Sequence, residues 1–144
     1  MIGFQFSETM QGTWRKNGTS DDKPIVFSVT ARAASLWNHL FDKRTKLDGT
    51  INAEGLATNA SVTGELTLDP LGKRIIRYDL EFVADDKRNY RLRGQKDVRF
   101  LDLKHSMTTL PATIYDDRET PIGSSMLTFD KRDLPSFLAS WRLA

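Results

Sequence analysis

The sequence of 144 residues contains no cysteine and only five prolines, and it has no long apolar run. The lack of cysteine excludes disulfide scaffolds, thiolate metal sites and cysteine nucleophiles. No segment approaches the roughly 18 consecutive apolar residues that a membrane-spanning helix needs, and residues 1–6 are too short for a secretory signal peptide. We therefore expect a cytoplasmic protein with no membrane span, folded as a single domain over residues 1–144.

Motifs for nucleotide and metal cofactors are also lacking. The chain has neither a Gly-x-Gly-x-x-Gly sequence nor a phosphate-binding loop. Its two histidines, His39 and His105, have no second ligand at metal-binding spacing. No Gly-x-Ser-x-Gly elbow is present, although a Ser-His-Asp triad can be assembled from residues far apart in sequence. We expect no cofactor and no metal, and the sequence assigns no catalytic residue.

What the sequence does contain is a repeated alternation of apolar and polar residues, which is typical of half-buried β-strands. The predicted strands are 4–14, 25–31, 50–56, 59–68, 76–82, 90–100, 106–115 and 122–129. Helical spacing predicts two short helices, at 33–41 and 134–141, and Asp48-Gly49 predicts a turn. We expect an all-β fold in which about eight antiparallel strands form a single lipocalin-like barrel. A two-sheet sandwich is the alternative.

The formal charge of +2 hides a local excess of basic residues. Residues 73–104 hold ten basic and six acidic side chains, whereas the rest of the chain holds eleven and thirteen. If Phe82 and Tyr90 flank the turn of a hairpin as opposed residues, Glu81 and Arg91 also face each other, as do Asp79 and Arg93 two residues further along. Opposite charges in this register stabilise the pairing of the two strands on a solvent-facing surface. Because these arginines already have acidic partners, we do not expect nucleic-acid binding.

Two charged residues fall on predicted apolar faces. Glu8 is in phase with Phe6 and Met10, and Lys96 is in phase with Leu92, beside Gly94. A buried lone charge is expensive, so a partner, a water or a ligand is expected beside it. One interpretation is a polar anchor that fixes the head of a small ligand inside the barrel. The other places one or both residues at a strand end, or on a bulged strand, where the charge reaches solvent.

Two resemblances follow from these residues. Gly12-Thr13-Trp14 is similar to the Gly-x-Trp signature on the first strand of lipocalins and related barrels. In that family the tryptophan packs at the closed end of the barrel, which implies a structural role for Trp14.

The second resemblance covers most of the chain. Four segments resemble, in order, a small β-domain that occurs within long bacterial glucose–methanol–choline oxidoreductases of cholesterol-oxidase-like type and also as stand-alone bacterial proteins: Phe6–Gly12, Tyr78–Phe82, Tyr90–Lys96 and Thr108–Leu110. The flavin-binding part of those enzymes has no counterpart here, so the resemblance does not imply oxidase activity. It implies an accessory or ligand-related barrel near lipid or sterol metabolism.

Our leading hypothesis is a non-catalytic barrel that binds a small, partly apolar ligand or assists a partner enzyme. The candidate ligand-binding residues are Glu8, Lys96, Tyr78, Trp14 and Phe6. A second hypothesis is an isomerase or cyclase that uses Glu8 as its acid/base in an apolar pocket. A third is a protein–protein module, in a homodimer or with a partner enzyme. It would dock through the terminal helix or through the strand containing Pro111, because proline favours an edge strand or a bulge.

Overall fold

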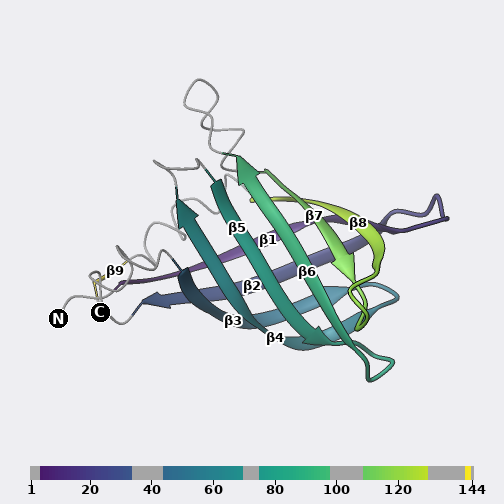
Figure 1. Ribbon diagram of the computed structural model, residues 1–144, viewed down its shortest axis with the longest axis horizontal. Helices are drawn as coiled ribbons and strands as arrows, with labels where there is room; N and C mark the ends of the chain where they lie inside the picture. Colours follow the sequence, from purple (N-terminus) through teal and green to yellow (C-terminus); the bar gives the residue numbers. More distant parts are fainter. Residues whose placement is uncertain (1–3, 34–43, 70–74, 98–108, 130–141, 144) are drawn as a thin grey trace.

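The computed structural model describes residues 4–33, 44–69, 75–97, 109–129 and 142–143, and these form nine β-strands (Figure 1). The strands are β1 (Phe4–Lys16), β2 (Lys23–Ala33), β3 (Arg44–Ala53), β4 (Ala57–Asp69), β5 (Ile75–Val83), β6 (Asn89–Asp97), β7 (Thr109–Tyr115), β8 (Pro121–Thr128) and β9 (Arg142–Leu143).

Strands β1 to β8 close into an antiparallel barrel. Each strand from β2 to β7 pairs with the next one along the chain, and β1 pairs with both β8 and β2. Residues 4–14 of β1 pair with β2 and residues 11–16 pair with β8, so the two pairings overlap at residues 11–14. The short β9 pairs with the first residues of β1. This closure confirms the predicted all-β barrel and excludes the alternative, a two-sheet sandwich.

The core of the barrel follows from the alternation of the strands. Side chains at every second position point inward, and the largest ones are fully buried. This set comprises Phe27, Met10, Ile25, Ile51, Leu66, Leu80, Leu92, Leu110, Ile114, Leu127 and Val62. All eight strands of the barrel contribute to this set, so apolar side chains from every wall meet in one interior.

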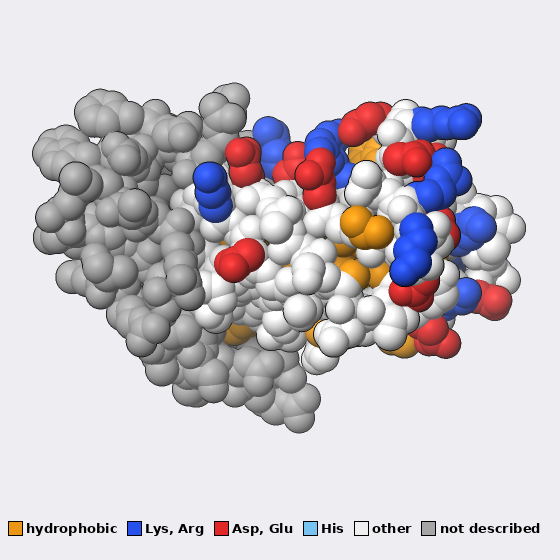
Figure 2. All heavy atoms as spheres, turned by 90° about the horizontal axis from the view of Figure 1, so that it is seen from below, with side chains coloured by type: hydrophobic (Ala, Val, Ile, Leu, Met, Phe, Trp, Pro, Cys, Tyr) orange, Lys and Arg blue, Asp and Glu red, His pale blue; other side chains and the backbone are white. Residues whose placement is uncertain are grey.

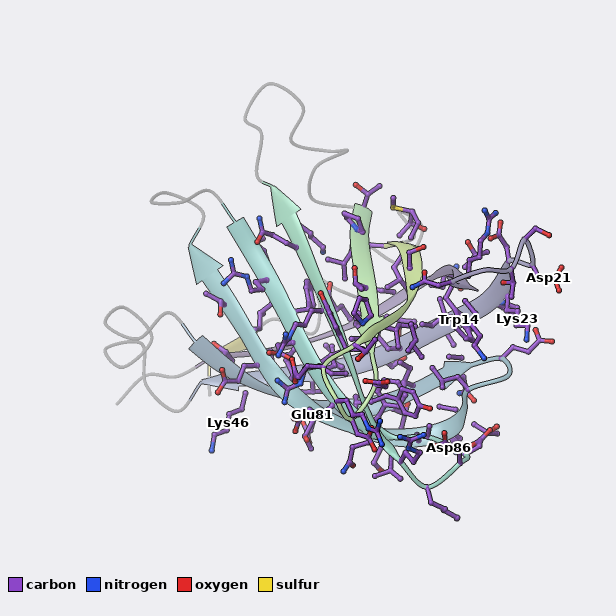
Figure 3. All side chains as sticks on the ribbon, turned by 45° about the vertical axis from the view of Figure 1, so that its right-hand side comes forward. Trp14, Asp21, Lys23, Lys46, Glu81 and Asp86 are labelled. Carbon is purple, nitrogen blue, oxygen red and sulfur yellow. The ribbon has the colours of Figure 1, made fainter. Side chains whose placement is uncertain are left out.

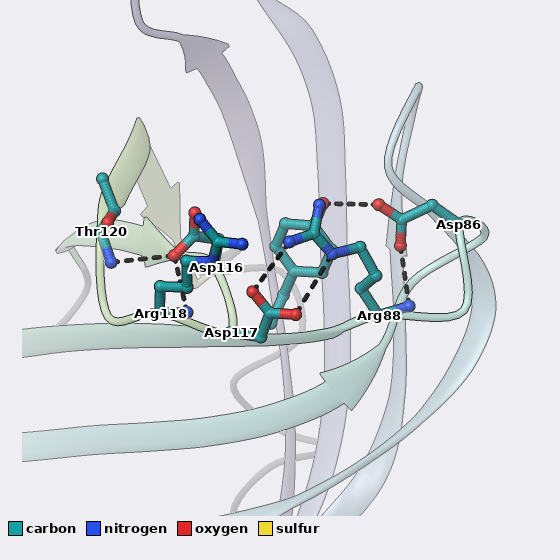
Figure 4. A network of polar contacts seen from close by, with 7 residues as sticks. Asp86, Arg88, Asp116, Asp117, Arg118 and Thr120 are labelled. Carbon is teal, nitrogen blue, oxygen red and sulfur yellow. Dashed lines mark hydrogen bonds and ion pairs between the residues drawn. The ribbon is translucent and has the colours of Figure 1, made fainter.

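The connections at residues 17–22, 54–56, 84–88 and 116–120 lie at one end of the barrel, which we call the turn end. Polar contacts join two of them (Figure 4). The Arg88 guanidinium donates to both carboxylate oxygens of Asp117, at 3.1 and 3.2 Å. Asp116 accepts backbone N–H groups of its own turn, including that of Thr120 at 2.9 Å. The Arg88–Asp117 contact ties the β5–β6 turn to the β7–β8 turn, and the Asp116 contacts hold the β7–β8 turn together.

The predicted register of the β5–β6 hairpin is confirmed. Phe82 faces Tyr90, with ring centroids 6.1 Å apart, and the pairs Glu81–Arg91 and Asp79–Arg93 face each other on the outer surface. Arg91 forms an ion pair with Glu81, and Arg93 Nε lies 3.5 Å from Asp79 Oδ2. On the face shown in Figure 2, basic and acidic side chains are interspersed over the described part.

The predicted turn at Asp48-Gly49 is wrong. Both residues lie inside β3, which begins at Arg44, and the β3–β4 turn comes at residues 54–56. Gly49 has a different purpose there, because a Cβ at this position would stand 1.8 Å from the carbonyl oxygen of Ser28 on β2. The glycine allows two strand backbones to approach closely within a continuous strand.

We therefore expect Gly49→Ala to lower the free energy of unfolding by about 1–3 kcal/mol, because the added methyl meets backbone that must shift. Thr50→Ala, at the exposed neighbouring position, should stay within about 0.5 kcal/mol of wild type. Urea denaturation measures both. Equal stability of the two variants would contradict the close approach of β2 and β3.

Of the edge and the bulge that the sequence predicts as alternatives for the strand with Pro111, the edge is wrong, because β7 pairs with β6 on one side and β8 on the other. The pairing of β7 with β8 does shift register, between Ile114 and Tyr115. Its pairing with β6 begins at Ala112, one residue after the proline. Pro111 is exposed and lies opposite Met126 of β8. The proline is accommodated where the pairing with β6 has not yet begun, so an edge is not needed.

The two predicted helices lie outside the described residues, except that Ala33 is the last residue of β2. His39 and His105 lie outside them as well. The described part of the chain contains no helix, and hence none long and apolar enough to cross a membrane.

Candidate ligand-binding site

The barrel brings together three of the five predicted ligand-binding residues. Glu8 comes from β1, Tyr78 from β5 and Lys96 from β6. Because β5 and β6 are neighbours, Tyr78 and Lys96 lie on adjacent inward positions of one hairpin. Strand β1 pairs with neither of them, so the Glu8 side chain meets both from across the interior. We call these residues the Glu8–Tyr78–Lys96 cluster.

Hydrogen bonding and charge connect the cluster. The Tyr78 hydroxyl donates to Oε1 of Glu8. The Lys96 ammonium lies 4.0 Å from the other oxygen, Oε2, and 5.2 Å from the centroid of the Tyr78 ring. At these distances the ammonium has an ion-pair partner and a cation–π partner.

The cluster is buried, with relative exposures of 8% for Glu8, 2% for Tyr78 and 4% for Lys96. The sequence left open whether the two charged residues reach solvent at strand ends, and the structure shows that they do not. Removing two charges from water carries a large desolvation cost, and their mutual attraction offsets it only when geometry and hydrogen bonding are both favourable.

Burial changes the proton affinities within the cluster. It lowers the pKa of the Lys96 ammonium, although the nearby Glu8 charge acts in the opposite direction. Burial also raises the pKa of Tyr78 well above its ordinary value of 10.0, and the charge and hydrogen bond of Glu8 add to this shift. At neutral pH Tyr78 is therefore protonated, and its hydroxyl donates a hydrogen bond to Glu8.

Lys96 is the least satisfied member of the cluster. An ammonium has three N–H donors, yet within the described residues no hydrogen bond to this group is found, and Glu8 is its ion-pair partner at 4.0 Å. Buried polar groups in proteins nearly always have a hydrogen-bond partner. A small acceptor, such as a hydroxyl or carbonyl oxygen, would satisfy the donors of Lys96.

An aromatic ring packs against the cluster, and a further buried polar residue lies on β3, two strands away from β5. The Phe27 ring packs against Tyr78, with centroids 6.0 Å apart and planes at 58°. Thr45, near the start of β3, is a buried polar residue that the sequence did not single out. The apolar Leu47 follows it at the next inward position. The prediction missed this alternation because it placed a turn at Asp48-Gly49 and began the strand at residue 50, whereas β3 begins at Arg44.

Trp14 and Phe6 are not part of the cluster as the structure describes it. Trp14 is buried at the turn end (Figure 3), where its indole N–H donates to the carbonyl of Glu54 at 3.1 Å. This contact fastens the β3–β4 turn to β1. Phe6 lies on β1 opposite Ala31, and its side chain lies outside the described part of the structure.

The described outer surface has a groove of about 700 Å³ that runs across β5, β6, β7, β8 and β1. Arg15, Arg77 and Arg93 line it. Each of these already has a polar partner, because Arg15 pairs with Asp22 at 2.8 Å, Arg77 donates to Gln95 and Arg93 pairs with Asp79. The inward-facing cluster therefore remains the stronger candidate site.

The fold and the cluster define a closed antiparallel β-barrel with a polar group of residues inside it. Comparison of the chain with protein-family models, curated proteins and solved structures gives no match. The resemblances to lipocalins and to the oxidoreductase-associated domain therefore stay predictions. Within the described ranges, no three or more His, Cys, Asp or Glu residues form a group that could hold a metal ion.

The raised pKa of Tyr78 predicts an effect of alkaline pH on stability. Above about pH 10 an unfolded tyrosine releases its proton while buried Tyr78 retains it, so the folded state binds more protons and loses stability as the pH rises. We expect Tyr78→Phe to lessen this loss by about 1 kcal/mol per pH unit above pH 10. The lowered pKa of Lys96 acts below 10.5, where it makes stability rise with pH.

Tyrosinate absorbance distinguishes Tyr78 from Tyr90 in this test. The hydrogen bond to Asp86 raises the pKa of Tyr90 to about 12, and Tyr90 can ionise without unfolding because it is only partly buried. Tyr78 should ionise only together with the loss of folded structure. Ionisation of Tyr78 in the folded barrel near pH 10 would contradict its burial against Glu8.

Proposed function

We propose that this protein is a non-catalytic binding barrel for a small, partly apolar molecule of lipid- or sterol-like character. The polar head of the ligand contacts Glu8, Tyr78 and Lys96, and its apolar body contacts the barrel wall. One observation carries the proposal: Lys96 is only 4% exposed, and within the described residues its ammonium has an ion-pair partner, Glu8 at 4.0 Å, but no hydrogen-bond acceptor. A ligand oxygen would supply that acceptor.

Energetics support a functional reason for the cluster. Buried ion pairs can often be replaced by apolar residues of similar volume with no loss of stability. The chain nevertheless has Glu8 and Lys96 on otherwise apolar inward faces. Ionisable residues in costly surroundings of this kind occur often at functional sites.

The charges of the cluster favour a neutral head group on the ligand. A hydroxyl can accept a hydrogen bond from Lys96 and donate one to Glu8, whereas a carboxylate would be repelled by Glu8. A carbonyl can accept from Lys96 alone. We therefore expect alcohols and carbonyl compounds to bind better than the corresponding acids.

Thermal unfolding with a panel of sterols, fatty alcohols and fatty acids tests the proposal, with each compound delivered in cyclodextrin and carrier alone as the blank. A ligand at 100 times its Kd should stabilise the fold by about 2.7 kcal/mol, which raises the Tm by roughly 5–10 °C at this chain length. Lys96→Met should lose the shift, and the matched variant Lys46→Met, on the outer face of β3 (Figure 3), should keep it. A panel in which no compound shifts wild type would overturn the proposal.

A second candidate function is proton transfer by an isomerase or cyclase that uses Glu8. The hydrogen bond from Tyr78 to Glu8 favours it, because it places a proton donor and a carboxylate base side by side in an apolar interior. Proton exchange of an enolisable ketone in D₂O, followed by NMR, separates the two functions. Exchange that is faster with wild type than with Glu8→Gln would establish catalysis, whereas equal rates agree with binding alone.

An accessory role beside an enzyme of lipid metabolism rests on the sequence resemblance alone. The structure removes one route to such a partner, since β7 with Pro111 is not a free edge. Purification from the native host would recover a partner enzyme in stable complex.

A further inference from the structure

We propose that Lys96 forms a reversible imine with the carbonyl carbon of a small apolar aldehyde or ketone that enters the barrel. This inference rests on the proposed function, because the carbonyl compound must first occupy the same site. It goes further by making the contact covalent and by limiting the ligand to carbonyl compounds.

Burial sets Lys96 apart from the other lysines that the structure describes. Lys16, Lys46 and Lys87 are exposed and Lys23 is half-buried, whereas Lys96 is 4% exposed on an inward position of β6. An amine in such surroundings is more readily available as the neutral nucleophile, because burial lowers its pKa. The same burial keeps bulk water away from an imine once it forms.

The reaction balances with the groups of the cluster alone. Glu8, 4.0 Å from the ammonium, accepts one proton from Lys96. The freed lone pair forms the C–N bond, and the carbonyl oxygen takes a second proton from the nitrogen to give a carbinolamine. The hydroxyl then leaves as water with the proton held by Glu8. One ammonium and one carbonyl thus give one iminium and one water, with no other reactant.

The hydrogen-bonding capacity of the site fits an iminium better than it fits the ammonium of Lys96. The ammonium has three donors, for which the cluster offers one carboxylate. An iminium has a single N–H and the same positive charge. Its ion pair with Glu8 and its cation–π contact with the Tyr78 ring, 5.2 Å away, can both persist. Imine formation thus removes two of the three N–H donors without altering the charge balance.

The test uses the full chain with octanal and cuminaldehyde, trapped by sodium cyanoborohydride and mapped by peptide mass spectrometry. We expect Lys96 to gain the reduced adduct about tenfold faster than exposed Lys46 or Lys87. The corresponding alcohols, octanol and cuminyl alcohol, should protect Lys96 and leave labelling of the two exposed lysines unchanged. Lys96→Arg keeps the positive charge and cannot form the adduct, and a cooperative urea unfolding transition establishes that this variant is folded.

Thermal shifts with the alcohols also distinguish a failure of imine formation from a failure of the proposed binding function. If the alcohols raise the Tm but Lys96 gains no adduct from either aldehyde, the imine is overturned and non-covalent binding stands. If neither alcohol nor aldehyde raises the Tm and labelling is confined to exposed lysines, both proposals fail. Labelling of Lys96 at the same rate as Lys46, without protection by the alcohols, would also overturn the imine site.

Discussion

Glu8→Leu is expected to lower the free energy of unfolding by about 3–5 kcal/mol, because it leaves the buried Lys96 ammonium without its counter-charge. It also leaves the Tyr78 hydroxyl without its acceptor. Urea denaturation of the variant and wild type measures the loss. Leucine preserves most of the volume of the side chain, so the effect comes mainly from polar groups left unpaired.

The double variant Glu8→Leu/Lys96→Met shows whether the two charges act as a pair. Replacing a whole buried ion pair by apolar residues is often neutral or stabilising by about 1–4 kcal/mol. We therefore expect the double variant to recover most of the stability lost in the single one. Two single effects that simply add would show that the residues do not interact, which would contradict the cluster.

Phe27→Ala is expected to cost about 3–5 kcal/mol of stability, since the ring is fully buried and its removal leaves a cavity that the barrel cannot fill. The variant should also weaken ligand binding, because the ring packs 6.0 Å from Tyr78 and limits where the tyrosine can lie. Urea denaturation and the thermal-shift panel measure the two effects. Ligand binding by Phe27→Ala is measured at low temperature, where this less stable variant is still folded.

Two variants control for this second prediction. Phe27→Leu retains most of the apolar volume and should cost much less than alanine. Thr63→Ala, at an exposed position of β4, should remain within about 0.5 kcal/mol of wild type. A Phe27→Ala protein as stable as Thr63→Ala would contradict the placement of Phe27 in the core.

Much of the local architecture could be predicted from the sequence, because alternation determines which side of a strand each residue faces. It placed Glu8 and Lys96 on apolar faces, and it gave the register that pairs Glu81 with Arg91. Both results depend only on residues within one strand or one hairpin. Neither needs knowledge of how the barrel closes.

The meeting of Glu8 with Tyr78 could not be predicted in the same way. The two residues are 70 positions apart, and they face each other only because β1 pairs with both β2 and β8. This closure is a property of all eight strands together. The error at Gly49 has a local cause, because glycine after aspartate is typical of turns, and only the nearby β2 backbone explains it.

Native mass spectrometry of the protein purified from its own host tests the central claim most directly. We expect wild type to carry a small, partly apolar molecule at about one copy per chain, and we expect Lys96→Met purified in parallel to have lost most of it. A wild-type protein that is free of any small molecule, and whose Tm no sterol, fatty alcohol or fatty acid raises, would contradict the account.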